Sequence, residues 1–127
     1  MKLAVVGSRT FKNKSFIEAC LSATPGITEI VSGGAIGPDS FAEAWAKKKG
    51  ITTVIFKPDW NLGNGAGIIR NRQIVGYADE VMAFWDGLSR GTQYTVDFAR
   101  KMKKRVMLFI ETDPKTDTTT FENVQEE

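Results

Sequence analysis

The chain has 127 residues, 42% of them hydrophobic, and a formal net charge of +2, which suits one globular domain with its own core. It has no histidine, which excludes Ser-His-Asp and Cys-His catalytic groups and histidine zinc sites, and its single cysteine, Cys20, excludes an internal disulfide. No stretch approaches the roughly 20 apolar residues of a membrane-spanning helix, and Met1 leads directly into a strand-like run, so we expect a cytoplasmic protein without a membrane partner.

Apolar runs and helical patterns alternate along the first 110 residues. The patterns predict strands at 3–6, 27–31, 51–56, 81–85 and 106–110, and helices at 16–21, 41–46, 67–75 and 95–102. This alternation is typical of a parallel sheet covered on both faces. We therefore predict a Rossmann-like, doubly wound α/β domain over residues 1–110, with a mainly parallel sheet of about five strands. Its ligand crevice should lie beyond the carboxyl ends of the strands.

The last 17 residues differ from the rest of the chain in charge and in pattern. Residues 111–127 contain six acidic side chains against one basic side chain, Lys115, and show no periodicity. We interpret them as an acidic tail that is disordered or ordered only against a partner. Residues 1–110 carry 16 basic and 9 acidic side chains, a net charge of +7. Such a basic body suits an anionic partner, although several of its lysines fall near predicted helix ends, where cations also favour the helix dipole.

The loops after the first two strands are rich in glycine and hydroxyl groups. The first reads Gly7-Ser8-Arg9-Thr10-Phe11, in which the glycine permits a tight exit and Arg9 can hold an oxyanion, although a plain turn with a surface arginine explains it equally well. The second reads Ser32-Gly33-Gly34-Ala35-Ile36-Gly37-Pro38-Asp39 and opens a helix. Its glycines and the helix dipole predict a phosphate cradle, with Asp39 either complementing the dipole or binding a ribose hydroxyl. The spacing matches neither the dinucleotide-binding fingerprint nor the Walker A motif.

The loops after the third and fourth predicted strands repeat this chemistry. Pro58-Asp59-Trp60 precedes a glycine-rich stretch and a helix with Arg70 and Asn71. Trp60 is either a stacking platform or a core residue, and Arg70 is expected to pair with a phosphate. The fourth loop contains Asp86, Gly87, Ser89, Gly91 and Thr92 and again leads into a helix. The candidate ligand-binding residues are therefore Gly7, Ser8, Arg9, Thr10, Phe11, Ser32, Gly33, Gly34, Ala35, Gly37, Asp39, Asp59, Trp60, Arg70, Asn71, Asp86, Gly87, Ser89, Gly91 and Thr92.

Taken in order, these motifs resemble the SLOG superfamily, and its small YspA-like branch in particular. The resemblance spans residues 1 to about 110 and implies a Rossmann-like fold, binding of nucleotides or their derivatives, and self-association into a homo-oligomer. The superfamily includes the Lonely Guy phosphoribohydrolases, which cleave nucleoside monophosphates, and the DNA-processing protein DprA, which binds single-stranded DNA. In the Lonely Guy motif a catalytic glutamate follows the Gly-Thr pair, but that position is Thr95 in this chain.

Because the phosphate-cradling loops lack an identifiable general base, we favour a binding module for a nucleotide or a nucleotide-derived phosphate ligand, related to ADP-ribose or to a signalling nucleotide. It would sense or sequester this ligand and need no cofactor or metal. One alternative is a nucleotide phosphoribohydrolase or other N-glycosidic hydrolase that uses Asp39, Asp59 or Asp86. A second alternative is single-stranded nucleic-acid binding by the basic body. We favour it less, because the sequence shows no clear row of stacking aromatic residues and no long basic groove.

Overall fold

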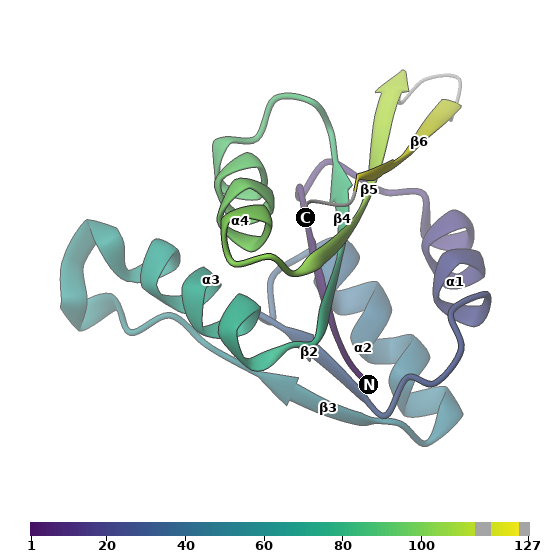
Figure 1. The fold of residues 1–127 in the computed structure, drawn as a ribbon, viewed down its shortest axis with the longest axis horizontal. Helices are drawn as coiled ribbons and strands as arrows, with labels where there is room; N and C mark the ends of the chain where they lie inside the picture. Colours follow the sequence, from purple (N-terminus) through teal and green to yellow (C-terminus); the bar gives the residue numbers. More distant parts are fainter. Residues whose placement is uncertain (114–117, 125–127) are drawn as a thin grey trace.

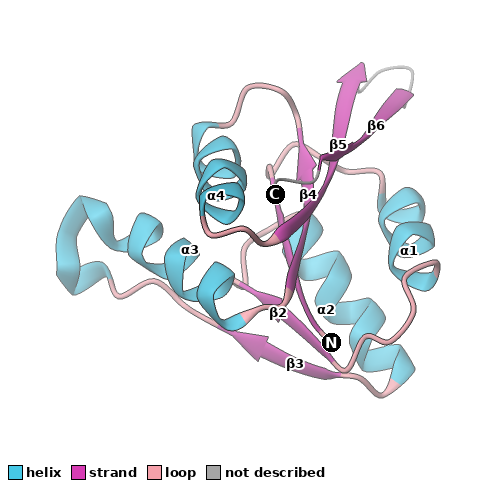
Figure 2. Cartoon of the chain, viewed as in Figure 1, coloured by secondary structure: helices cyan, strands magenta, loops and turns pink. Residues whose placement is uncertain are grey.

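Helices cover both faces of one sheet in the computed structural model of the chain, which describes residues 1–113 and 118–124 (Figure 1). The strands are β1 (Lys2–Gly7), β2 (Glu29–Ser32), β3 (Thr52–Ile55), β4 (Glu80–Trp85), β5 (Arg105–Asp113) and β6 (Thr118–Val124). The helices are α1 (Lys14–Ser22), α2 (Pro38–Lys49), α3 (Ala66–Tyr77) and α4 (Arg90–Lys101), and a short 3-10 helix, η1 (Trp60–Gly65), precedes α3 (Figure 2).

The strand order is β3-β2-β1-β4-β5-β6, and β1 to β5 are parallel. The predicted Rossmann-like, doubly wound fold with about five parallel strands is thereby confirmed. The connections reverse direction between the neighbouring strands β1 and β4. In this class of fold a crevice opens outside the carboxyl ends of the strands at such a reversal. None of the described helices is long and apolar enough to cross a membrane.

Alternating side chains along the strands divide the core into two layers. Leu3 and Val5 of β1 face α1 and α2, whereas Ala4 and Val6 face α3 and α4. The first layer is rich in aromatic rings: those of Phe84 and Phe109 stack with centroids 5.2 Å apart, and Phe16 and Phe11 pack against them. The second layer is aliphatic and includes Ile74, Val75, Val81, Val96, Val106 and Leu108.

The helix boundaries follow from local capping residues. The Asn13 side chain accepts a hydrogen bond from the Phe16 N–H at 3.2 Å and starts α1. Pro38 occupies the start of α2, where its missing N–H costs nothing, and Gly50 ends the helix in a left-handed conformation with φ 70°. Ser89 caps α4, so this helix begins at Arg90, five residues before the predicted start.

The acidic tail differs from its expected irregular structure. β5 continues to Asp113, and β6 pairs with it in an antiparallel arrangement, with Phe109 opposite Phe121. Residues 114–117 and 125–127 lie outside the described residues. The missed signal is local, because Thr118-Thr119-Thr120-Phe121 is a run of β-branched and aromatic residues, which favours a strand.

Gly7 lies where the loops after β1, β2 and β4 meet. A Cβ atom at this position would lie 2.5 Å from the Pro38 Cγ and 2.6 Å from the Phe84 carbonyl oxygen, closer than real Cβ contacts. The Ser8 N–H donates to the same carbonyl at 2.9 Å, which holds the exit of β1 against β4. A side chain at Gly7 would therefore force apart the start of α2 and the end of β4.

We predict that Gly7→Ala destabilises the protein by about 2–3 kcal/mol through overpacking. Gly76→Ala is the matched control, because a Cβ at Gly76 of α3 meets nothing within 4 Å and alanine is the better helix former. Urea unfolding of the two variants measures the difference. Equal unfolding midpoints for Gly7→Ala and the wild type would show that the junction relaxes without cost.

Candidate functional site

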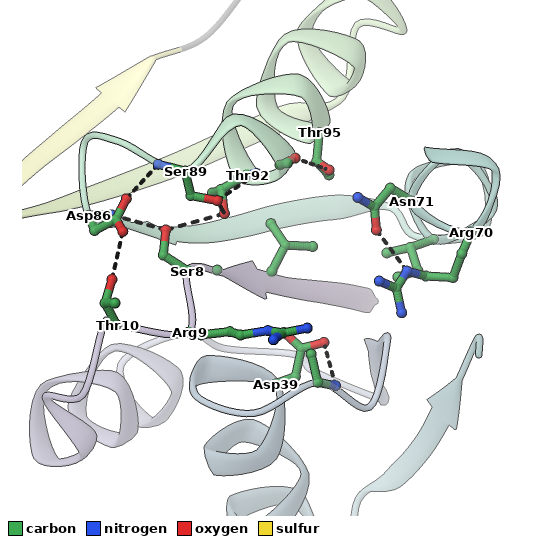
Figure 3. Close-up of a pocket in the computed structure, with 15 residues that line it drawn as sticks. Ser8, Arg9, Thr10, Asp39, Arg70, Asn71, Asp86, Ser89, Thr92 and Thr95 are labelled. Atoms are coloured by element: carbon green, nitrogen blue, oxygen red, sulfur yellow. Dashed lines mark hydrogen bonds between the residues drawn. The ribbon is translucent and has the colours of Figure 1, made fainter. Parts of the chain in front are cut away.

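A pocket of about 350 Å³ opens at the carboxyl edge of the sheet, at the β1/β4 reversal (Figure 3). Its walls come from the loop after β1, the start of α2, the middle of α3 and the loop that leads into α4. The lining residues are Val6, Gly7, Ser8, Arg9, Thr10, Ala35, Asp39, Arg70, Asn71, Ile74, Asp86, Ser89, Gly91, Thr92 and Thr95. The topology thus brings together side chains from four segments that lie far apart in the sequence.

Asp86 fastens the loop after β4 to the loop after β1. Its Oδ1 accepts hydrogen bonds from the N–H groups of Leu88 and Ser89, both at 2.8 Å, and its Oδ2 accepts the Thr10 hydroxyl at 2.6 Å. Burial alone would raise the pKa of Asp86, but these hydrogen bonds outweigh it and hold the pKa below its ordinary value. Asp86 therefore carries its charge throughout the neutral range and shapes the pocket rim.

Three hydroxyl groups gather beside the amino end of α4. The Ser8 Oγ lies 3.3 Å from the Thr92 Oγ1, and the Thr92 hydroxyl lies 3.3 Å from the Ser89 Oγ. Ser8 and Thr92 are buried, whereas Gly91 is exposed. The first turn of a helix leaves backbone N–H groups without intrahelical partners, and its dipole is positive at this end. This wall therefore offers hydrogen-bond donors to an anionic or hydroxyl-bearing ligand.

Asp39 organises the opposite wall of the pocket. The side chain is 6% exposed, and its Oδ2 accepts the N–H groups of Gly33 at 2.9 Å and Ala35 at 3.4 Å. Burial raises the pKa of Asp39 to about 6, against the opposing effects of those two N–H groups and of Arg70. Burial disfavours the ionised form of Asp39 in the folded protein. The free energy of unfolding therefore falls as the pH rises from the ordinary pKa of 3.8 to about 6.

Arg70 is turned toward the backbone of neighbouring loops. Its Nη1 donates to the carbonyl oxygen of Gly33 at 2.9 Å and lies 3.5 Å from that of Phe56, while its Nε donates to the Asn71 side chain at 2.8 Å. The guanidinium packs on Gly33, where a Cβ would lie 2.3 Å from Nη1. Arg70 lines the pocket as expected, but much of its hydrogen-bonding capacity joins α3 to the ends of β2 and β3.

Arg9 is the cation that remains available in the pocket. It is exposed, and it makes no hydrogen bond or ion pair with any residue of the described chain. Figure 3 shows its side chain reaching along the pocket from the end of β1. An arginine presents several N–H donors in a planar fork, which matches phosphate oxygens.

Twelve of the predicted binding residues line the pocket and eight do not. Phe11 is wholly buried in the aromatic core, and Ser32 is buried and donates to the Glu43 carboxylate at 2.5 Å. Asp59 accepts the Asn61 N–H at 3.1 Å and caps η1, which carries Trp60. The others outside the pocket are Gly33, Gly34, Gly37 and Gly87, which shape the loops.

Three lining residues were not among the predicted binding residues. Val6 and Ile74 supply apolar surface, and Thr95 lies one turn after Gly91, whose carbonyl accepts the Thr95 hydroxyl at 2.9 Å. Ile74 and Thr95 could have been found from helical spacing, since Ile74 follows Arg70 by four residues and Thr95 follows Gly91 by four.

The carboxylates named for hydrolysis are each engaged in holding a loop. Asp39, Asp59 and Asp86 accept backbone N–H groups of their own loops. Thr95, at the position of the family glutamate, has no acidic function. Within the described residues, no group of three or more acidic or cysteine side chains is placed to hold a metal ion.

Two known proteins resemble this chain over most of its length. Gene 61 protein of Mycobacterium phage D29 is 32% identical over 111 residues, which cover 79% of this chain and 89% of the phage protein. The DNA processing protein A (DprA) of Helicobacter pylori, described as binding single-stranded DNA, shares its fold with a TM-score of 0.68 at 23% sequence identity. The match covers 85% of this chain, which spans 64% of the DprA chain.

The DprA comparison corrects two of our predictions. We had favoured a small nucleotide-derived ligand, and we had favoured nucleic acid less as a partner. DprA, a solved structure with this fold, is a single-stranded DNA-binding protein, and this finding favours the second alternative instead. We had discounted nucleic acid because the sequence shows no long basic groove or aromatic row.

The family assignment rests on two independent matches. The model of the YspA, cpYpsA-related SLOG family matches residues 1–63, which include the loops after β1 and β2. The phage relative extends the similarity through most of the chain. The SLOG resemblance of the loop motifs is thus confirmed, and the chain belongs to the YspA, cpYpsA-related SLOG family.

Proposed function

We propose that the pocket at the β1/β4 reversal binds single-stranded nucleic acid, with single-stranded DNA as its first candidate. The observation that carries the proposal is Arg9, an exposed cation without an ion-pair partner in the described chain, beside the hydroxyl wall of Ser8 and Thr92. A phosphate can accept hydrogen bonds from an arginine fork, from hydroxyls and from the amino end of a helix. The DprA fold supports a DNA strand as the bearer of that phosphate.

The volume of the pocket suits a small part of a strand, and exposed apolar side chains on the segments that follow β2, β3 and β4 offer contacts to bases. Leu88, in the loop that leads into α4, is 84% exposed, and Ile36, in the loop before α2, is 72% exposed. Trp60 is 70% exposed on η1, the segment that projects beyond the end of β3 (Figure 1). Bases stack on aromatic rings with little dependence on sequence. We therefore expect binding with weak base preference.

The charge distribution limits how strongly salt can affect this binding. The pocket is lined by two arginines, Arg9 and Arg70, and two aspartates, Asp39 and Asp86. The lysines at 47–49 and 101–104 end α2 and α4 and therefore lie toward the amino ends of the strands, away from the pocket. Two or three phosphate contacts would give a slope of log affinity against log salt of roughly −1.5 to −2.

Arg9→Gln is expected to weaken binding of an oligothymidylate by tenfold or more, because a charged hydrogen bond contributes roughly 1.5–3 kcal/mol. Fluorescence anisotropy with labelled DNA measures this affinity. Arg105→Gln is the matched control, since Arg105 is exposed beside Glu80 at the start of β5 and carries the same charge. Equal losses in both variants would indicate only general attraction to a basic protein, and no binding by the wild type would refute the proposal.

Trp60→Ala should also weaken binding, because loss of one stacked base corresponds to about 1–3 kcal/mol. Its exposure means that the substitution removes little packing from the core. Trp45→Phe is a useful contrast in fluorescence, since Trp45 is buried in the core. DNA should quench the emission of wild type and Trp45→Phe but not that of Trp60→Ala. Unchanged affinity and quenching in Trp60→Ala would remove this platform from the binding surface.

Binding should tighten as the pH falls from about 7.5 to about 5.5, because Asp39 has a pKa of about 6 and loses its negative charge over that range. The chain has no histidine that would titrate in the same range. Oligonucleotides without terminal phosphates keep the DNA charge constant. In Asp39→Asn, affinity at pH 7.5 should match the low-pH value and vary little with pH. A wild-type affinity that is flat or falls on acidification would contradict this.

A further inference from the structure

A cation–aromatic cluster lies where α3 and α4 pack against each other, and we call Arg72, Tyr94 and Phe98 the Arg72 cluster. The rings of Tyr94 and Phe98 stack with centroids 6.3 Å apart and an interplanar angle of 8°. The Arg72 guanidinium carbon lies 5.8 Å and 5.4 Å from these two ring centroids. The Arg72 Nε donates to the Tyr94 hydroxyl at 2.7 Å. This arrangement fixes a long side chain in one orientation.

The charge of Arg72 is not neutralised by a nearby carboxylate. Arg72 is exposed, and the ion pair found within the described chain joins other residues, Arg105 and Glu80. Its Nε is occupied by Tyr94, and neither terminal amino group of its guanidinium donates to a described residue. An arginine that is already ordered loses less side-chain entropy when it binds an anion. The cluster therefore holds Arg72 preorganised to bind a phosphate.

The Arg72 cluster adjoins the pocket through both of its helices. Asn71, the neighbour of Arg72 on α3, lines the pocket, as does Thr95, the neighbour of Tyr94 on α4. In Figure 3 the side chains of Asn71 and Thr95 project from these two helices at the same end of the pocket. A strand that leaves the pocket over the outer surface of the packed helices α3 and α4 would therefore pass Arg72, which is exposed there.

We propose that Arg72, held by Tyr94 and Phe98, contacts the backbone of a bound single strand outside the pocket and sets the path along which the strand leaves it. This inference rests on the proposed function of the pocket. A nucleic acid fits better than an acidic peptide, because the adjoining pocket offers hydroxyls and helix amides suited to phosphate, and exposed apolar side chains suited to bases. The strand thus has two contact regions, the pocket and the Arg72 cluster.

The test compares a short and a long oligothymidylate, of about 4 and about 12 nucleotides, by fluorescence anisotropy. Arg72→Gln should leave the affinity for the short strand unchanged and lower that for the long strand roughly fivefold to tenfold. Its salt slope on the long strand should become shallower by about 0.7, the effect of one lost phosphate contact on a single strand. Arg105→Gln, which removes the same charge at the start of β5, should change neither length.

Two further variants separate the arrangement of the cluster from its charge. Tyr94→Phe keeps the stacked ring but removes the hydroxyl that accepts from Arg72, and Arg72→Lys keeps the charge but loses the planar fork. Both should show a smaller loss on the long strand than Arg72→Gln. Thermal melting of each variant shows whether the fold is kept. We expect little change in melting temperature for the Arg72 variants, because Arg72 is exposed.

Failure of this inference is distinguishable from failure of the proposed function. If the wild type binds neither strand, the nucleic-acid function itself is wrong. If the wild type binds both strands and Arg72→Gln matches it on both, or loses equally on both, the proposed exit path is overturned. A third outcome is that polyglutamate binds the wild type but not Arg72→Gln, while DNA binding is unaffected by that substitution. This result would assign the cluster to an acidic peptide instead.

Discussion

The close approach of β1, β4 and the start of α2 at Gly7 positions the pocket walls that these three segments form. At this point the exit of β1, the carbonyl of Phe84 and the ring of Pro38 occupy space that a single methyl group would overfill. The hydrogen bond from the Ser8 N–H to Phe84 then sends the chain after β1 across the end of β4. Because α2 and α4 both start beside this junction, their amino ends face the same volume. Close packing at Gly7 thus positions these walls, and the side chains of Asp39, Arg70 and Asp86 hold the adjoining loops.

Much of the fold could be predicted because the strand and helix patterns are local. The alternation of apolar runs with amphipathic stretches gave all five parallel strands and four helices, and glycines marked the loops at the sheet edge. β6 was missed because its run of threonines and Phe121, although typical of a strand, lies beside acids and Pro114, and the sequence does not show its pairing with β5. The site was predicted less completely. The topology predicts which residue types lie at the edge of the sheet. It does not predict whether Arg70 faces a ligand or Phe11 enters the core, because both depend on tertiary contacts.

The difference between Arg70 and Arg9 shows why residue type alone did not identify the ligand. Both arginines line the pocket, but one supports the ends of β2 and β3 while the other has no described partner. Similarly, the net positive charge of the body suggested a broad attraction for anions, yet many of its lysines lie at the carboxyl ends of α2 and α4, at the far edge of the sheet. The nucleic-acid proposal therefore depends on a few oriented groups, with Arg72 as an extension of the same surface.

The hydrogen bonds of Asp86 show that some residues of the site hold its loops in place while others are free to contact a ligand. Its carboxylate accepts hydrogen bonds from Thr10 and from the backbone of its own loop, and these bonds hold the rim in shape. Side chains without such structural duties, such as Arg9 and Leu88, can be exchanged without dismantling the rim. The hydrogen bonds that shape the rim therefore belong to different side chains from those that are free to meet a ligand.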